Sequence, residues 1–166
     1  MTMRRFAIIC GLAAFASLAV AATSWRYYAN DRFGVSAEVP ANWREEPPPA
    51  NDDGRIFDSP DGKAQIIANG GFVMEESAAL ALETLAKPRG GERVTYTKRG
   101  ALSVTLSGLS GDNIFYRRTI LTCSGKVWNN LEINYPASEK AAYDGIVAHA
   151  AASLHGGAPA GMQCGA

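Results

Sequence analysis

The short motif Gly108-Leu109-Ser110-Gly111-Asp112 is the one that most closely approaches a catalytic signature. It nearly matches the Gly-x-Ser-x-Gly nucleophile elbow of serine hydrolases, but Asp112 stands where the second glycine is required. The elbow also needs a strand-to-helix turn in a parallel sheet, whereas strand-like sequence lies on both sides of Ser110. We therefore interpret the motif as a turn between strands.

The two histidines, His149 and His155, do not have the spacing of metal ligands. They are six residues apart, which is about 600° around an α-helix, so they would face different directions. No serine or cysteine in the chain has an obvious histidine partner for a hydrolytic triad. We expect no catalytic, cofactor-binding or metal-binding residues.

A group of acidic residues could suggest calcium, but its spacing is wrong. The segment Asn51-Asp52-Asp53-Gly54, together with Asp58 and Asp61, lacks the Asp-x-Asp-x-Asp-Gly loop and the distant Glu of a calcium-binding loop. Two polar turns on either side of a short strand explain the pattern.

Arg117 and Arg118 are adjacent in a predicted strand, so their side chains point to opposite faces of the sheet. One of them would lie near Trp128 or Glu132 on the neighbouring strand. We expect a cross-strand charge pair or a cation–π contact there rather than an anion-binding site.

Residues 1–21 have the pattern of a secretory signal peptide. Arg4 and Arg5 precede an apolar run over residues 6–20, and Ala19-Val20-Ala21 offers small residues for cleavage. The alternative is an uncleaved membrane anchor, but the run is shorter than the ~20 residues of a spanning helix and is rich in alanine.

Cleavage at Ala21 would remove Cys10 and leave two cysteines, Cys123 and Cys164. In an oxidising compartment this pair indicates one disulfide, which would join the glycine-rich tail to the end of a strand. The alternative is two free thiols.

The overall composition is that of an ordinary globular domain. The 166 residues include 16 basic and 16 acidic side chains, without a basic block that would indicate nucleic acid. We expect the partner to be a protein or a small ligand, with membrane contact only if the N-terminal segment is retained.

The stretch 113–136 predicts a β-hairpin around which the domain is organised. On its second arm Val127, Leu131, Ile133 and Tyr135 share one face, which should contact the core. The other face can meet water, and it carries these residues: Trp128, Asn130, Glu132 and Asn134.

The remaining pattern predicts further strands and two helices. Strands are expected over residues 31–40, 55–58, 63–73, 93–98 and 102–106, with a bulge or bend at Gly70-Gly71. Helices are expected from a cap at Ser77 to residue 87, and from a cap at Ser138 to residue 154. These elements predict a single α+β domain over residues 25–155, in which an antiparallel β-sheet is flanked by helices, and a glycine-rich tail over residues 156–166.

The segment from Asp31 to Trp43, in which Phe33-Gly34-Val35 runs into Pro40, resembles the opening strand of the PsbP-like superfamily. The Ser59-Pro60-Asp61-Gly62 turn and the order of elements over residues 28–154 are also similar. The resemblance implies an antiparallel sheet flanked by helices, the PsbP-like sandwich, acting as an accessory or binding module. Members include extrinsic photosystem subunits and a nuclear-import factor, so the fold does not define one function, and no family-wide catalytic residues carry over.

We therefore expect a periplasmic or secreted, non-catalytic accessory or binding module of the bacterial cell envelope, with no cofactor. Two alternatives remain open at this point. One is an enzyme whose site is assembled from loops, and the other is a membrane-anchored accessory subunit of a larger complex.

N-terminal sequencing of the exported protein tests the cleavage. We expect the mature chain to begin with Ala22 or Thr23, because the small residues Ala19-Val20-Ala21 suit signal peptidase. A chain that retains the Met1 region would instead establish the anchor.

Overall fold

The structure is a computed structural model that describes residues 23–164; the predicted signal peptide and the last two residues of the tail lie outside this part of the chain. Within it, no helix is both long and apolar enough to cross a membrane. In chain order the elements are β1 (Trp25–Asn30), β2 (Val35–Pro40), β3 (Arg44–Glu45), β4 (Gly54–Asp58), β5 (Gln65–Phe72), α1 (Ala78–Leu85), β6 (Glu92–Gly100), β7 (Ser103–Ser110), β8 (Asn113–Thr122), β9 (Val127–Pro136), α2 (Lys140–Ser153) and β10 (His155–Gly156).

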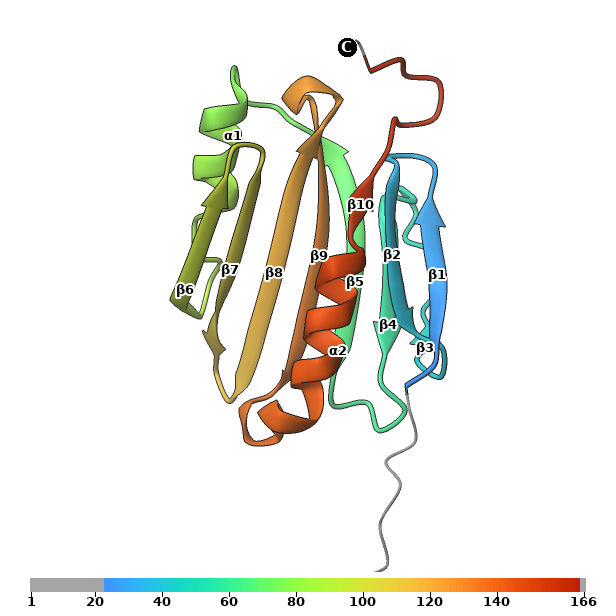
Figure 1. The fold of residues 1–166 in the computed structure, drawn as a ribbon, viewed down its shortest axis with the longest axis vertical. Helices are drawn as coiled ribbons and strands as arrows, with labels where there is room; N and C mark the ends of the chain where they lie inside the picture. The colour runs from blue at the N-terminus through green and yellow to red at the C-terminus, as the bar shows by residue number, and fades with distance from the viewer. Residues whose placement is uncertain (1–22, 165–166) are drawn as a thin grey trace, which may run out of the picture.

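The strands form two antiparallel sheets (Figure 1). The large sheet has seven strands in the order β3-β4-β5-β9-β8-β7-β6, and the small sheet has three in the order β1-β2-β10. The predicted hairpin is the centre of the large sheet, because β9 pairs with both β8 and β5. This arrangement confirms the α+β class and the antiparallel sheet flanked by helices.

The main core lies between the large sheet, the small sheet and α2. Val35 and Val39 of β2 pack against Leu131 and Ile133 of β9, and all four are fully buried. Helix α2 adds the side chains of Tyr143, Val147, Ala150 and Ala151 to the same cluster, and Leu154, which directly follows the helix, joins them. The predicted inward face of β9 is therefore confirmed.

The opposite face of the large sheet is covered too, contrary to the prediction that it can meet water. Helix α1 packs Ala81 and Leu82 against Leu106 and Phe115 on that face. Asn130 and Glu132 keep only 4% and 6% of their surface exposed. The two helices thus lie on opposite faces of the large sheet, and α1 hides a partly polar surface.

Two local predictions were wrong, and one strand was missed. β1 was not predicted, although residues 25–30 pair along their whole length with β2, and residues 31–34 form a turn instead of the start of a strand. Ser138 does not cap α2, which is entered through a 3₁₀ turn over Ala137–Glu139. Ser77 does cap α1, as predicted, by accepting a hydrogen bond from the backbone N–H of Leu80 at 3.2 Å.

The Gly70-Gly71 pair forms no bulge, because the register between β5 and β9 is continuous. Its glycines serve close packing instead. A Cβ atom at Gly71 would lie 2.5 Å from the Trp128 ring, and one at Gly70 would lie 2.7 Å from the Cβ of Phe33. The indole of Trp128 can therefore lie flat on the sheet only while residue 71 has no side chain.

The Cys123–Cys164 disulfide is present, as predicted, and it joins the tail to the end of β8. Backbone bonds hold the tail as well: the N–H of Gly157 donates to the carbonyl of Gly34 at 2.7 Å, and that of Ala160 donates to Asp31 at 2.7 Å. The tail is thus attached to both sheets.

Replacing both cysteines by serine should lower the free energy of unfolding by about 3–4 kcal/mol, because the bridge closes a long loop of 41 residues. Urea unfolding of the wild type and of the Cys123→Ser/Cys164→Ser variant measures the difference. Reduced wild type should behave like the variant, and a variant with an unchanged midpoint would show that the bridge adds no stability.

Candidate functional site

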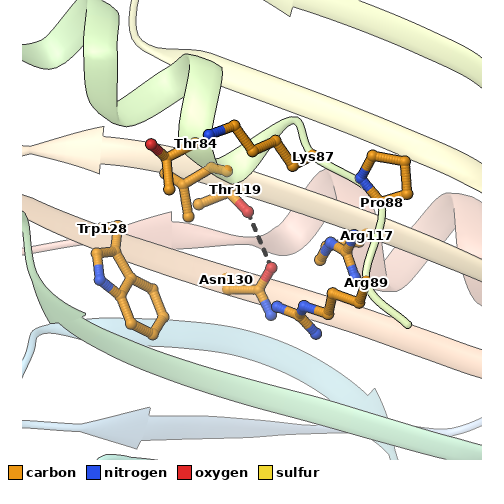
Figure 2. Close-up of a pocket in the computed structure, with 9 residues that line it drawn as sticks. Thr84, Lys87, Pro88, Arg89, Arg117, Thr119, Trp128 and Asn130 are labelled. Atoms are coloured by element: carbon orange, nitrogen blue, oxygen red, sulfur yellow. Dashed lines mark hydrogen bonds between the residues drawn. The ribbon is translucent and has the colours of Figure 1, made fainter. Parts of the chain in front are cut away.

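A polar pocket lies beneath the end of α1, on the face of the large sheet opposite the main core (Figure 2). Its volume is about 220 Å³. The end of α1 and the loop after it form one wall, and β8 and β9 form the floor. The pocket is lined by these residues: Thr84, Leu85, Lys87, Pro88, Arg89, Arg117, Thr119, Trp128 and Asn130.

An ion-pair network anchors the floor at Arg117, whose side chain is 3% exposed. Its Nη1 donates to Glu92 Oε1 at 2.8 Å and its Nη2 donates to Glu92 Oε2 at 3.0 Å. Nη1 also donates to Glu132 Oε2 at 3.3 Å. Arg89 reaches the same Glu132 oxygen from the loop at 2.7 Å, so four charged groups join strand, loop and floor.

Opposing effects set the ionisation of this network. Burial disfavours the charged form of Glu92, but hydrogen bonds from Arg117 and from the backbone N–H of Arg89 outweigh it and hold the pKa of Glu92 below its usual value. Burial likewise disfavours the charge of Arg117, but its bonds to Glu92 and the field of Glu132 raise its pKa. The pairs are therefore ionised at neutral pH.

Neutral polar groups complete the floor. Thr119 Oγ1 donates to Asn130 Oδ1 at 2.9 Å (Figure 2), and Asn130 Nδ2 donates to Asn69 Oδ1 at 3.1 Å. These bonds fix the amide orientation of Asn130. The floor is rigid because each of its polar side chains has a protein partner.

The rim differs from the floor because it retains unused donors. Within residues 23–164, neither Lys87 Nζ nor the indole N–H of Trp128 has a hydrogen-bond partner, and Lys87 forms no ion pair. Arg89 is 59% exposed and bonds Glu132 through Nη1, which leaves its other nitrogens to face the pocket or solvent. Chemically, the pocket offers cationic and N–H donors to an acceptor.

The residues that sequence reasoning set aside as catalytic or metal-binding do not line this pocket. Ser110 is the last residue of β7, not a strand-to-helix elbow. His149 lies on α2, where its ring stacks on Trp25 with centroids 3.8 Å apart and its Nε2 contacts Glu38. His155 lies in β10, and its Nδ1 is 2.7 Å from the carbonyl oxygen of Ser153.

The acidic residues of the two turns are paired individually rather than gathered around one point. Asp58 pairs with Arg44 at 3.0 Å, Asp61 accepts from Ser59 at 2.6 Å, and Asp53 accepts from Asn51 at 2.9 Å. Across residues 23–164 no group of three or more His, Cys, Asp or Glu could hold a metal ion.

The prediction of a cross-strand charge pair was right, since Arg117 and Glu132 are direct partners in the ladder between β8 and β9. Arg118 points to the other face, where its Nη1 donates to the carbonyl of Ala151 at 2.7 Å. Sequence reasoning missed Lys87, Arg89 and Glu92, because a loop after a helix carries no periodicity that shows where it folds. One signal in the sequence could have indicated the site. Asn130 and Glu132 on one strand lie opposite Thr119 and Arg117 on the next, which places four polar side chains together.

Comparison with known proteins adds evidence about the fold. No protein-family model matches the chain, and no curated protein matches it in sequence. Among solved structures, it is similar to cyanobacterial PsbP (CyanoP) from Synechocystis sp. PCC 6803, with a TM-score of 0.58 and 10% identity over 86% of this chain and 98% of that one.

Two further structures are similar. LpqN, involved in cell envelope biogenesis of Mycobacterium tuberculosis, has a TM-score of 0.52 and 16% identity over 79% of this chain and 89% of its own. The Ran-binding protein Mog1p of Saccharomyces cerevisiae has a TM-score of 0.51 and 11% identity over 81% of this chain and 96% of its own.

These likenesses show that the chain is an α+β sandwich. The chain shares its fold with cyanobacterial PsbP, as the resemblance inferred from the sequence implied. At such low identities the comparison shows the fold alone, and the site must be argued from this chain's own residues.

The charge network predicts how stability depends on pH. Glu92→Gln should lower the free energy of unfolding at pH 7 by about 2–3 kcal/mol, since it removes one carboxylate from the buried guanidinium. Because the folded-state pKa of Glu92 is lowered, its contribution to the free energy of unfolding is complete above about pH 4.5. That contribution is lost as the pH falls through the folded-state pKa. Urea unfolding at several values between pH 7 and pH 2 should therefore show a smaller acid-induced loss in the variant.

Glu83→Gln is the matched control, because Glu83 is an exposed residue of α1. It should unfold like the wild type at every pH. Equal behaviour of the Glu92 and Glu83 variants would mean that the network does not stabilise the fold.

Proposed function

We propose that this protein is an exported, non-catalytic binding module of the cell envelope whose pocket beneath α1 receives a carboxylate group. The observation that supports this proposal is the contrast between a floor whose polar groups are satisfied and a rim whose cationic donors are not. A preorganised floor with free donors around it suits binding, because the donors need no rearrangement to meet a ligand.

The charge balance of the pocket favours an anionic group. Three cations, Lys87, Arg89 and Arg117, face two carboxylates, Glu92 and Glu132. Both carboxylates already accept from the arginines, so the remaining positive charge is at Lys87 and on the free side of Arg89. A carboxylate at the rim would form charge-assisted hydrogen bonds with both.

The size of the pocket favours a small group. Drug-sized ligands occupy roughly 300–1,000 Å³, whereas this pocket holds about 220 Å³. That volume suits a short dicarboxylate, or the acidic side chain of a partner protein. The two sources share their chemistry, and binding experiments can separate them.

Export is supported by two features of the chain. Residues 1–21 read as a signal peptide, and the Cys123–Cys164 bridge is of the kind that persists in oxidising compartments. LpqN, which has a similar fold, is involved in cell envelope biogenesis. A bacterial periplasm or the exterior would suit all three observations.

The loop-site enzyme is the alternative that this pocket also allows, because part of its wall is a loop and its lining is polar. The lining supplies cations and hydroxyl groups rather than a paired acid and base, which favours binding over turnover. A hydrolytic activity that disappears in Ser110→Ala would contradict the non-catalytic proposal. The other alternative, a membrane-anchored subunit, is distinguished from the exported module by the N-terminal sequencing described above.

Binding can be measured by NMR titration of the ¹⁵N-labelled protein with succinate and with a short glutamate-containing peptide. We expect shifts of the Trp128 indole N–H and of the backbone at Lys87 and Arg89, with little change on titration with succinamide. Lys87→Gln should weaken binding roughly fivefold, because one charge-assisted bond is lost.

Lys126→Gln is the matched control, because Lys126 is an exposed lysine that does not line the pocket. It should bind as the wild type does. If succinamide bound as well as succinate, or if Lys87→Gln had no effect, the carboxylate pocket would be disproved. Preference for the peptide over succinate would identify a protein side chain as the source of the carboxylate.

A further inference from the structure

A second recess lies on the opposite face of the large sheet, and it is distinct from the pocket beneath α1. Helix α2 lies over β9 and reaches β8, where Arg118 bonds the Ala151 carbonyl, but β6 and β7 lie clear of the helix (Figure 1). The recess between α2 and these strands has a volume of about 420 Å³. We call it the α2 groove.

The α2 groove is mostly apolar. Leu109, Ile114 and Tyr116 rise from β7 and β8, and Val147 of α2 faces them. Tyr96 of the edge strand β6 forms the outer wall and is 50% exposed. These side chains provide an aliphatic and aromatic surface, part of which remains open to solvent.

One end of the groove is cationic. A neighbouring recess of about 270 Å³ shares Tyr96 and Tyr116 with it and is also lined by Lys98, Arg99 and Arg118. No carboxylate is among its lining residues. Within residues 23–164, Lys98, Arg99 and Arg118 form no ion pairs, and Arg118 is held in place by its 2.7 Å bond to the Ala151 carbonyl.

We infer that the α2 groove binds a single-chain amphiphile with an anionic head, such as a fatty acid. The alkyl chain would lie along Ile114, Tyr116 and Val147, and the head would lie between Lys98 and Arg118. Charge complementarity determines the orientation, because the lining cations without a carboxylate partner are at one end. At the other end Lys140 is paired with Asp144 at 2.7 Å.

The backbone of the groove favours an alkyl chain over a peptide. The strands β7 and β8 pair on both sides, so their N–H and C=O groups are used within the sheet. A peptide lying on this face would bury its own backbone groups without partners, which costs free energy. An alkyl chain has no such groups to satisfy.

The groove also favours a free amphiphile over a bilayer. Its apolar residues are recessed between α2 and the sheet, and most of them are only partly exposed. Binding to a bilayer would need an apolar surface that protrudes. A single chain can enter a recess of this size.

Calorimetric titration of the exported domain with octanoate, decanoate and dodecanoate, each below its aggregation concentration, tests the inference. We expect the affinity to rise roughly three- to tenfold with every two added methylenes, because each buries more apolar surface. Dodecyl maltoside, which has the same chain and a neutral head, should bind at least fivefold more weakly than dodecanoate.

The variant Lys98→Gln/Arg99→Gln should weaken dodecanoate binding about tenfold without unfolding the protein, since both side chains are exposed. Tyr96→Ser should weaken all three fatty acids. Lys87→Gln, which alters only the pocket beneath α1, should leave dodecanoate binding unchanged. Thermal unfolding of each variant confirms that the fold is intact.

Four results would overturn the inference. The first is equal affinity for dodecanoate and the maltoside, and the second is an affinity independent of chain length. The third is loss of dodecanoate binding in Lys87→Gln but not in the Lys98/Arg99 variant, which would place the ligand beneath α1. The last is an affinity for phosphatidylglycerol vesicles, measured by co-flotation, that equals the affinity for free dodecanoate. That result would identify a bilayer as the ligand and would refute the inference. The carboxylate pocket is tested by separate variants, so either proposal can fail alone.

Discussion

The neutralisation of one buried guanidinium is the constraint on which this architecture depends. Arg117 lies in the middle of the large sheet, on the face that α1 and its loop cover. An unpaired charge there would be too costly to bury, so the face could not be closed. Glu132 from β9 and Glu92 from the start of β6 compensate the charge, and Arg89 extends the pairing into the loop. Covering the second face therefore requires this loop conformation.

The two faces of the large sheet consequently have different chemistry. One is closed by apolar packing of the small sheet and α2 over Leu131 and Ile133. The other combines the apolar contacts of α1 with charged and amide groups that hold one another in place. Apolar packing tolerates many sequences, whereas a satisfied polar network depends on specific partners. The fold can thus be shared with proteins that are only 10–16% identical to this chain.

Most of the fold was predictable because alternation along a strand and helical spacing are local properties. The central hairpin, α1 with its Ser77 cap and the inward face of β9 follow from such patterns, whereas the disulfide follows from the cysteine count and the expected compartment. The site was not predictable in the same way. Asn130 and Glu132 look like solvent-facing residues because the loop that covers them follows α1 and is remote in sequence. β1 was missed for a related reason, since its strand character comes from pairing with β2.

The pairing of strands distant in sequence has a consequence for the timing of folding. β5 must wait for β9, and β2 must wait for β10, before each acquires its second neighbour. Chains dominated by such pairings fold slowly, because a large loss of chain entropy precedes the contacts that compensate it. A slowly folding polypeptide stays unstructured for longer after synthesis, which is the state that a narrow translocation channel can accept. For the export proposed above, the sheet order itself would then keep the chain in a form that such a channel can accept.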